Sequence, residues 1–494
     1  MGGERLKILY VSSEVAPLSK TGGLADVSGS LPKAIKALGH DVRVVTPYYK
    51  MVKKHVKSTQ KVLNRLDVPV SDKEVRGSVE MTQIDGGVPV YLIKKESYFG
   101  RDDLYTTKQG DYKDNAERFV FFSRGVLEML RHIDFKPDII HCNDWQAGLI
   151  PTYLKTLYRK KDLYKDICSI FTIHNLGYQG IFWSLDMHLT NLPWDIFTIN
   201  GVEYYGNISF LKAGMVYADI LTTVSKGYSK EIQTPEYGLG MDGILRTRQK
   251  DLYGILNGAD YDHWSPDKDP YIVAPYDKSN LENKTKCKLD LLQEFGLKCR
   301  ATTPIIGMIS RLADQKGFDI LAESIDELMK MDIIFILLGT GDQKYEEMFT
   351  HIGDKYPKKT GIRIGFDNAL AHKIEAGSDI YLMPSKYEPC GLNQIYSLRY
   401  GTIPVVRATG GLDDTIIDIH ADPRKGNGFK FTDYTSKGLL ATIKRACDYY
   451  SHKEAWAQLV WRAMSLEYSW EKSAREYLKL YQDTLKKKAM APVG

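Results

Sequence analysis

The chain has 494 residues, of which 43% are apolar and 26% are charged. This length exceeds what one hydrophobic core usually supports, so two or three domains with a cleft between them are expected. A net charge of +5 is too dilute over this length to indicate nucleic acid or a membrane surface as a partner.

The N-terminal residues run directly into a strand-like segment and lack the apolar region of a secretory signal. No apolar run approaches the ~20 residues needed to span a membrane. The six cysteines are irregularly spaced without a C-x-x-C pair, which argues against a disulfide framework or a zinc site. These features predict a cytoplasmic protein.

Strand-length apolar runs alternate with helix-length amphipathic segments, which is typical of parallel-sheet α/β proteins. In the first half we expect a helix at about 24–38 and strands at 7–11, 42–45, 90–93, 138–140, 170–173 and 220–224. In the second half we expect a helix at about 318–331 and strands at 304–309, 333–338, 362–364, 379–383 and 403–406. Residues 257–284 between the halves contain three prolines, so we place the domain boundary there.

A glycine-rich segment occurs twice, as Thr-Gly-Gly-Leu-Ala-Asp at 21–26 and as Thr-Gly-Gly-Leu-Asp-Asp at 409–414. Each copy follows a predicted strand and opens a helix. Paired glycines there let backbone N–H groups face an anion at the positive end of the helix dipole. Each copy could bind a phosphate, and a tight turn that binds no ligand is the alternative.

The first glycine segment does not indicate a dinucleotide enzyme. Residues 21–29 do not spell G-x-G-x-x-G, and the second strand ends in Thr46-Pro47-Tyr48 where an acidic ribose ligand would be expected. Lys20 instead places a cation beside the backbone donors, which suits a diphosphate. Hydride transfer is therefore disfavoured.

Further polar residues lie where other predicted strands end. Arg311 and Lys316, on one loop after the first strand of the second half, can flank the phosphates of a leaving nucleotide diphosphate, although singly they could be surface charges. Pro389 precedes a helix that starts at Leu392 and places Glu388 at a sheet edge facing the expected cleft.

Two segments of the first half, 141–146 and 172–180, offer Asp, His and Asn side chains that we expect to point into the cleft and contact a sugar. An isolated histidine is usually a core residue, but His174 beside Asn175 at a strand end favours a functional role. Cys390 is disfavoured as a nucleophile, because no base lies in its segment.

Together these segments resemble bacterial glycogen synthase and plant starch synthase, which form glycosyltransferase family 5. The matching motifs are, in chain order, 20–27, the segments around His141 and His174, 310–312 with 316–317, 388–392 and 409–412. The resemblance covers nearly the whole chain. Six motifs in order, at the family's spacing, make it specific.

The resemblance implies a GT-B fold, an α/β architecture of two Rossmann-like, doubly wound parallel-sheet domains with the active site in the cleft between them. Residues 1–258 would form the N-terminal domain, which carries the acceptor side and the Lys20 loop. Residues 265–469 would form the domain that binds the nucleotide sugar. A final helix within 470–494 would cross back to the first domain.

The resemblance also implies roles for individual residues. The catalytic set would be Asp144, His174, Arg311, Lys316 and Glu388. Contacts with the nucleotide sugar would come from Lys20, Gly22, Gly23, Asp26, Asn175, Cys390, Gly391, Tyr396, Thr409, Gly410 and Gly411. The stretch 114–119 resembles a family segment near the acceptor.

The implied activity is transfer of glucose from ADP-glucose, with retention of the α configuration, to the non-reducing end of glycogen or a maltooligosaccharide. No motif supplies the carboxylate pair of a double displacement, so we favour departure of the diphosphate with attack on the same face. No cofactor and no metal are expected. Two Asp-x-Asp sequences, 260–262 and 267–269, lie in the predicted interdomain connection, where turn chemistry explains them.

Other interpretations stay open at this stage. A catalytically silent glucan-binding or nucleotide-sugar-sensing protein could share the scaffold, as could another GT-B transferase such as a sucrose or trehalose enzyme. The sequence does not separate ADP-glucose from UDP-glucose or give the oligomeric state. The expected partners are the sugar nucleotide and an α-1,4-glucan, with neither nucleic acid nor a membrane.

Overall fold

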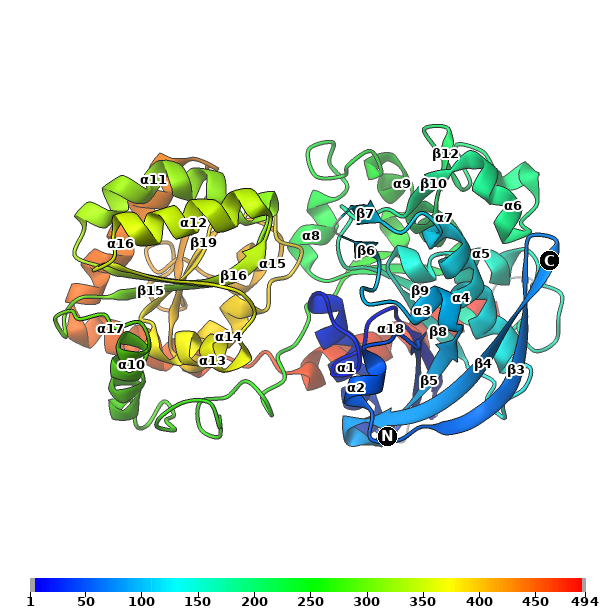
Figure 1. Ribbon diagram of the computed structural model, residues 1–494, viewed down its shortest axis with the longest axis horizontal. Coiled ribbons are helices and arrows are strands. Elements are labelled where there is room, and N and C mark those ends of the chain that lie inside the picture. The colour runs from blue at the N-terminus through cyan, green and yellow to red at the C-terminus, as the bar shows by residue number, and fades with distance from the viewer. Residues whose placement is uncertain (1–4, 108, 491–494) are drawn as a thin grey trace. The chain divides into compact units, whose positions relative to one another are not determined.

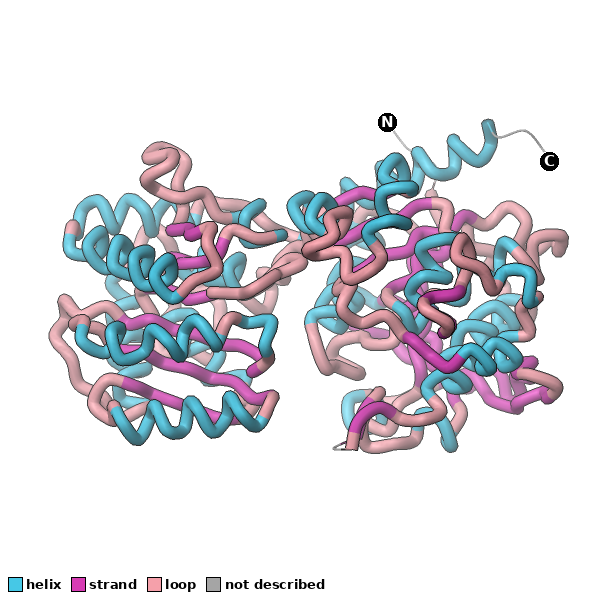
Figure 2. Tube along the Cα trace, turned by 90° about the horizontal axis from the view of Figure 1, so that it is seen from above, coloured by secondary structure: helices cyan, strands magenta, loops and turns pink. Residues whose placement is uncertain are grey.

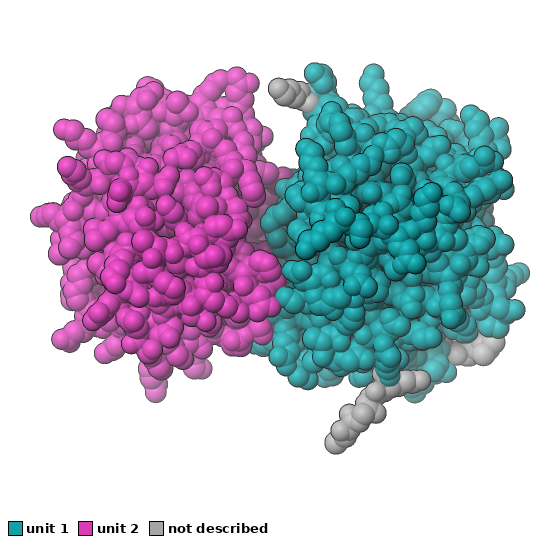
Figure 3. Space-filling view, turned by 60° about the horizontal axis from the view of Figure 1, so that its bottom comes forward, with its two compact units in different colours: residues 1–224, 229–258, 470–494 teal, residues 225–228, 259–469 magenta. Residues whose placement is uncertain are grey.

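The structure is a computed structural model that describes residues 5–107 and 109–490. The chain divides into two compact units, coloured separately in Figure 3. Unit 1 comprises Met1–Val224, Ser229–Gly258 and Trp470–Gly494, and unit 2 comprises Ser225–Tyr228 and Ala259–Ser469. Both units mix helices and strands (Figure 2).

The main sheet of unit 1 follows the predicted alternation of strands and helices. Its strand order is β14 (Leu252–Gly254), β13 (Ile220–Thr223), β9 (Cys168–Ile173), β8 (Ile139–Asn143), β1 (Lys7–Val11), β2 (Asp41–Pro47), β5 (Val88–Lys94), β4 (Lys73–Ile84) and β3 (Gln60–Val70). The strands from β14 to β5 pair in parallel, whereas β4 pairs antiparallel with both β5 and β3. Sequence analysis did not predict the β3–β4 hairpin, and its half-exposed, partly charged strands explain why.

The order in which strands are added to this sheet reverses at β1, which pairs in parallel with β2 on one side and with β8 on the other. In doubly wound sheets, ligands bind outside the carboxyl ends of the strands at such a switch point. The segments that follow β1 and β8 are therefore the natural ligand-binding segments of unit 1. They contain Lys20 and Asp144, respectively.

Helices complete unit 1. The longer ones are α1 (Gly23–Ala37), α4 (Asn115–Leu130), α5 (Leu149–Lys155), α7 (Phe210–Tyr217) and α18 (Trp470–Met490), and the shorter ones are α2 (Val52–His55), α3 (Glu96–Phe99), α6 (Met187–Thr190), α8 (Lys226–Glu231, partly in unit 2) and α9 (Asp242–Thr247). The C-terminal helix α18 buries a stripe that includes Trp470, Ala474, Tyr477 and Tyr481, and it packs on α1 and β9. Small antiparallel sheets are formed by β10 (Ile181–Trp183), β11 (Glu203–Tyr204) and β12 (Asn207–Ser209), and by β6 (Thr106–Thr107) and β7 (Gly110–Asp111).

Unit 2 contains a parallel sheet with the order β17 (Thr360–Ile364), β16 (Ile334–Gly341), β15 (Ile305–Leu312), β18 (Ile380–Met383), β19 (Ile403–Arg407) and β20 (Phe429–Phe431). Its switch point lies at β15, between β16 and β18. The segments after β15 and β18 contain Lys316 and Glu388. Arg311 lies within β15 rather than on the loop where sequence analysis expected it, because the strand continues to Leu312.

The helices of unit 2 are α10 (Glu282–Glu294), α11 (Phe318–Lys330), α12 (Gln343–Lys355), α13 (Asn368–Gly377), α14 (Asn393–Tyr400), α15 (Gly410–Thr415), α16 (Ser436–Ser451) and α17 (Lys453–Met464). In Figure 1, α11 and α12 lie on one face of the sheet, and α13 and α14 lie on the other. Helix α11 shows why: Phe318, Leu321, Ile325 and Leu328 recur at helical spacing and are buried. Burial of each such side chain contributes roughly 1.5–3 kcal/mol.

Two sequence-based expectations concern the chain as a whole. All six cysteines carry free thiols, in line with the absence of a disulfide pattern. Among the described helices, none has the combination of length and apolar composition that crossing a membrane requires.

Candidate active site

The loop that carries Lys20 connects β1 to α1 and is held by a buried carboxylate, Glu14. Thr21 donates its N–H and its hydroxyl to Glu14 at 2.5 and 2.6 Å, and Gly22 N–H donates to the same side chain at 3.2 Å. Lys20 forms an ion pair with Asp26 at 2.7 Å, with both side chains partly exposed. The structure therefore brings the predicted residues Lys20, Gly22 and Asp26 together, and it adds Glu14, which sequence analysis missed.

Gly22 and Gly23 have open space where a side chain would lie. A Cβ atom added at either residue would meet no heavy atom of residues 5–107 and 109–490 within 4 Å. Gly22 has extended backbone with φ −156°, and Gly23 begins α1, so backbone conformation does not require glycine at either position. A requirement for glycine would therefore have to come from a molecule that approaches the loop from outside.

Asp144 follows β8 in an unusual backbone conformation, with φ 55° and ψ −177°. Such a conformation costs a non-glycine residue on the order of 1–3 kcal/mol and persists only where its surroundings hold it. Here Asp144 donates its N–H to the Thr172 carbonyl, and its carboxylate accepts the N–H of His174 at 2.8 Å. Burial raises the pKa of the Asp144 carboxyl group to about 7, against the opposing effect of hydrogen bonds from the backbone N–H groups of His174 and Asn175.

His174 is oriented by Asn143. The Asn143 amide donates to the Val11 carbonyl, so its Oδ1 faces Nε2 of His174 at 2.9 Å. Since Oδ1 only accepts, His174 carries its proton on Nε2. Burial lowers the pKa of His174 to about 3, so the ring is neutral at physiological pH. Asn175, the next residue, uses its Oδ1 to accept the Gly177 N–H.

His141 does not join this group, contrary to the expectation for its segment. It lies within β8 and is fully buried, with Nδ1 at 2.6 Å from the Tyr481 hydroxyl and Nε2 at 2.6 Å from Thr172 Oγ1. Burial lowers its pKa to about 3. His141 is therefore a core residue that ties β8 to α18, because its strand position turns it into the sheet interface rather than toward the strand end.

Unit 2 joins its two switch-point segments through an ion pair. Lys316 Nζ lies 2.6 Å from Glu388 Oε2, and the side chains are only 19% and 8% exposed. Ser385 Oγ also donates to Glu388. Glu388 therefore fixes the Lys316 ammonium group at the carboxyl edge of the sheet.

Glycines allow the loops of this site to approach each other closely, because they have no side chain. Gly317 has φ +77°, and a Cβ there would lie 2.0 Å from the Pro384 carbonyl oxygen. A Cβ at Gly411 would lie 2.1 Å from the Cys390 carbonyl oxygen. Gly411 N–H also donates to the Glu388 carbonyl at 3.1 Å. The segments after β15, β18 and β19 consequently form one interlocked cluster.

The other predicted residues of unit 2 lie in and around this cluster. Arg311 is exposed, whereas Cys390 and Thr409 are buried. Gly391 and Gly410 adopt positive φ angles of 70° and 45°, so both need glycine for conformation. Tyr396 is buried, and its ring stacks on Trp264 with a centroid distance of 4.4 Å.

An exposed aromatic residue was also missed by sequence analysis. Phe366 is 82% exposed and follows β17, at the same carboxyl edge of the unit 2 sheet as Lys316 and Glu388. A large apolar ring left exposed at the ligand-binding edge of a doubly wound sheet can stack on a nucleobase. The signal available in the sequence was an aromatic residue two positions after a predicted strand.

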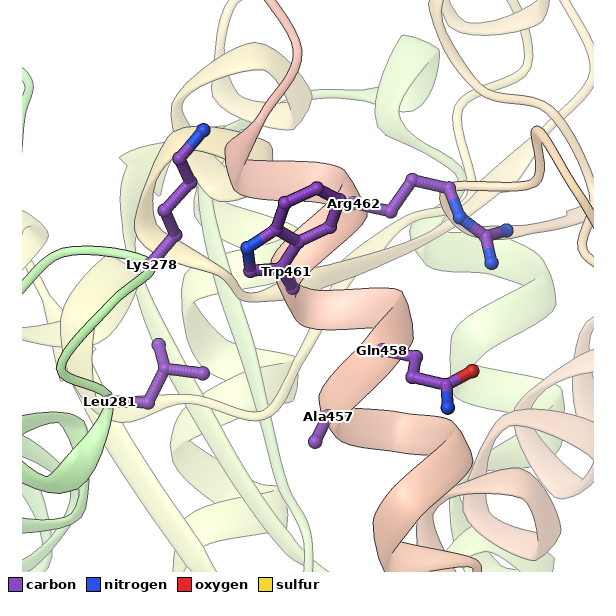
Figure 4. Close-up of a pocket in the computed structure, with 6 residues that line it drawn as sticks. All are labelled: Lys278, Leu281, Ala457, Gln458, Trp461 and Arg462. Atoms are coloured by element: carbon purple, nitrogen blue, oxygen red, sulfur yellow. The ribbon is translucent and has the colours of Figure 1, made fainter.

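A separate surface pocket of about 540 Å³ lies in unit 2. Figure 4 shows its lining residues: Trp461 and its neighbours on α17, opposite residues that precede α10. The full lining is Lys278, Leu281, Ala457, Gln458, Trp461 and Arg462. None of the residues that sequence analysis assigned to the site lines this pocket, so we do not place the chemistry there.

Known proteins are similar to this chain in both sequence and fold. The family profile described as starch synthase catalytic domain matches residues 7–247, and the profile described as glycosyl transferases group 1 matches residues 293–458. Glycogen synthase from Koribacter versatilis is 46% identical over 99% of this chain and 100% of its own length. Glycogen synthase from Moorella thermoacetica is 48% identical over 99% of each chain.

The chain belongs to the glycogen synthase and starch synthase family. Among solved structures, the catalytic domain of starch synthase IV from Arabidopsis thaliana, bound to ADP and acarbose, matches 98% of this chain and 100% of its own, with a TM-score of 0.91 and 32% identity. Sucrose-phosphate synthase from Thermosynechococcus elongatus matches 98% of this chain and 100% of its own, with a TM-score of 0.60 and 15% identity, a likeness of fold alone. The fold of the chain is therefore GT-B, as the family resemblance implied.

Proposed function

We propose that this glycosyltransferase moves glucose from ADP-glucose to the 4-hydroxyl at the non-reducing end of an α-1,4-glucan, with retention of the α configuration. The observation that carries the proposal is the Lys316–Glu388 pair at the switch point of unit 2. It places a fixed ammonium group where the diphosphate of a nucleotide sugar would lie. The family to which the chain belongs supplies the reaction class.

In this mechanism Lys316 and Arg311 stabilise the charge that develops on the departing diphosphate. The bond from the anomeric carbon to the phosphate oxygen breaks as the acceptor hydroxyl attacks the same face. The proton of the acceptor hydroxyl passes to the departing phosphate oxygen. The neutral His174 and the Asp144 carboxyl group would bind hydroxyls of the glucose, so the site orients the two sugars rather than supplying a carboxylate nucleophile.

The open space over Gly22 and Gly23 supports a donor contact on unit 1 as well. Lys20 beside these glycines offers a second cation for the phosphates. ADP is the nucleotide in the starch synthase IV structure, which supports adenine as the base of the donor. Phe366 is our candidate to stack on that base. The cytoplasmic location stays a prediction from the sequence.

Catalysis without a divalent metal belongs to the same proposal. Both Asp-x-Asp sequences have partners in the structure: Asp269 accepts from His372 and Tyr400, and Asp262 pairs with Lys268 at 3.0 Å. Asp260 accepts the Asp262 N–H, as expected in a turn. Turnover should be unchanged by exhaustive chelation, and activity that returns only on addition of Mg²⁺ or Mn²⁺ would contradict metal independence.

The deciding experiment measures nucleoside diphosphate release and chain elongation with a maltooligosaccharide and either ADP-glucose or UDP-glucose. We expect kcat/KM to be higher with ADP-glucose and the product to be longer by α-1,4-linked glucose. Binding of donor without release of diphosphate would identify the silent sensor. Elongation that is faster with UDP-glucose would reject the proposed donor.

A further inference from the structure

Glu14 is a carboxylate beside the Lys20 loop that accepts four hydrogen bonds, yet none of the assigned roles uses it. It lies three residues beyond β1, at the switch point of unit 1, and only 4% of its surface is exposed. A buried carboxylate is costly unless hydrogen bonds compensate it. Glu14 gains that compensation from the loop, through the Thr21 hydroxyl and the N–H groups of Thr21 and Gly22.

These hydrogen bonds change how the glycine loop can act. Backbone N–H groups at the start of a helix can bind a phosphate, but those of Thr21 and Gly22 already donate to Glu14. The loop can then offer an incoming donor the Lys20 ammonium and the open faces of Gly22 and Gly23. An internal anion thus fixes the path of the loop and directs its remaining groups outward.

Glu14 also connects the loop to a second segment of unit 1. The Tyr105 hydroxyl lies within hydrogen-bonding distance of two acceptors, Glu14 Oε1 at 3.0 Å and Ser13 Oγ at 2.7 Å. Burial raises the pKa of Tyr105 well above its usual value, so the hydroxyl keeps its proton. Asn115 in turn holds the Tyr105 carbonyl at 3.0 Å, and Arg118 holds the Leu104 carbonyl at 2.9 Å.

Asn115 and Arg118 belong to the stretch 114–119, which the family resemblance associates with the acceptor side. The hydrogen bonds therefore run from that stretch through Tyr105 and Glu14 to Thr21 and Gly22, next to Lys20. Arg118, at one end of this connection, is fully buried and donates to Tyr98, Leu104 and Asn115. The connection is continuous within unit 1.

We propose that Glu14 is a positioning residue for transfer: it holds the Lys20 loop in the conformation that receives the donor and couples that loop, through Tyr105, to the stretch 114–119. The inference rests on the proposed function for its substrates. It predicts that loss of Glu14 weakens donor use through the loop, with little change in the stability of unit 1 when the side chain keeps its shape.

The first test needs no substrate. Hydrogen–deuterium exchange should quicken at Thr21 and Gly22 in Glu14→Ala by about tenfold or more, because both N–H groups lose their acceptor. Glu14→Gln keeps an oxygen in place and should give a smaller increase. The matched control is Glu80→Gln, since Glu80 also accepts two side-chain hydrogen bonds, from Thr59 and Lys94, but lies on β4. It should leave exchange at Thr21 and Gly22 unchanged.

The second test is kinetic, with ADP-glucose and maltooligosaccharide varied separately. Displacement of a substrate-contacting loop can cost up to about 10²-fold in rate, so Glu14→Ala should lower kcat/KM for the donor by about 10²-fold. Glu14→Gln should raise the donor KM by about three- to tenfold, because it weakens charge-assisted bonds without removing them. Tyr105→Phe, which leaves Glu14 and the loop bonds in place, should have an effect of about threefold or less. Glu80→Gln should match the wild type.

The outcomes separate the inference from its alternatives. Unchanged exchange at Thr21 and Gly22 in both Glu14 variants would overturn it. A fall in thermal stability and kcat in Glu14→Ala, with an unchanged donor KM in Glu14→Gln, would show a structural role only and also overturn it. If wild-type protein transfers no glucose, the proposed function fails, while the exchange result still decides whether Glu14 holds the loop.

Discussion

The two Thr-Gly-Gly-Leu segments have the same sequence but contain glycine for different reasons. At 22 and 23 in unit 1, a Cβ would meet no heavy atom within 4 Å. At 410 in unit 2 the backbone has φ +45°, and at 411 a Cβ would lie 2.1 Å from the Cys390 carbonyl oxygen. The unit 2 segment needs glycine for its own packing, whereas the unit 1 segment leaves space that only an external molecule can use. A repeated motif therefore need not mean a repeated physical constraint.

The largest effect should come from removing the cation of the interlocked unit 2 cluster. Lys316→Ala should lower turnover by about 10²–10³-fold, the usual result of removing one group that stabilises transition-state charge. It should also lower the melting temperature, because Glu388 is left buried without its ammonium partner. Lys330→Ala, at an exposed pair with Glu327, is the control and should change neither quantity. Wild-type turnover in Lys316→Ala would remove this residue from the phosphate site.

The next largest effect should be on stability, in Gly411→Ala. The added methyl group cannot fit beside the Cys390 carbonyl without a shift of the backbone, which costs about 3 kcal/mol at the upper end for overpacking. Thermal unfolding followed by circular dichroism should show a clear fall in the melting temperature. An unchanged melting temperature would show that the unit 2 segment does not need glycine for its packing, and would contradict the proposed difference between the two segments.

Unit 1 should show a pH dependence of stability that comes from Asp144. Because burial raises its pKa to about 7 in the folded state, the folded protein binds more protons than the unfolded chain between roughly pH 4 and 7. This contribution to stability is thus largest at low pH and declines as the pH rises through that window. Asp144→Asn removes it, so the variant should gain stability relative to wild type, by on the order of 2 kcal/mol, as the pH rises from about 4 to 6. Parallel pH curves from denaturant unfolding of the two proteins would disprove the shift.

The smallest effect should be that of Gly22→Ala, which tests the open space directly. The melting temperature should stay at the wild-type value, because the methyl group meets nothing within unit 1. The donor KM should rise by about tenfold, which corresponds to roughly 1.4 kcal/mol of lost binding. Paired with Gly411→Ala, this variant separates a kinetic from a structural role. Loss of stability with an unchanged donor KM would reverse the interpretation.

The sequence was most informative where the relevant signal is local. The run at 7–11 coincides with β1, and Lys20, Asp144, Lys316 and Glu388 each follow a strand as expected. Strand ends can be predicted because apolar runs stop there and polar or turn-forming residues follow. The sequence does not show which segments share a switch point, because this depends on the strand order. Lys316 and Glu388, for example, form an ion pair although they are 72 positions apart in the chain.

What the sequence could not show depends on distant partners. Glu14 precedes the glycine loop by a few residues, but its importance comes from burial and from Tyr105, 91 positions away. His141 has the same residue type as His174, yet a position within β8 rather than at a strand end buries it against Tyr481. The β3–β4 hairpin was missed because its alternating, half-exposed strands lack the apolar runs of the parallel core.

The return of α18 to unit 1 has a consequence for how the protein matures on the ribosome. Unit 1 contains both the first residues of the chain and the last helix, whereas unit 2 is complete when residue 469 has emerged. The Tyr481 hydroxyl that satisfies His141, and the apolar stripe that covers α1, are translated only after the whole of unit 2. While the second unit is being translated, the first unit therefore lacks the hydrogen-bond partner of His141 and the helix that covers its apolar surface. A premature stop just after residue 469 would release a chain whose second unit is intact and whose first unit cannot close its core.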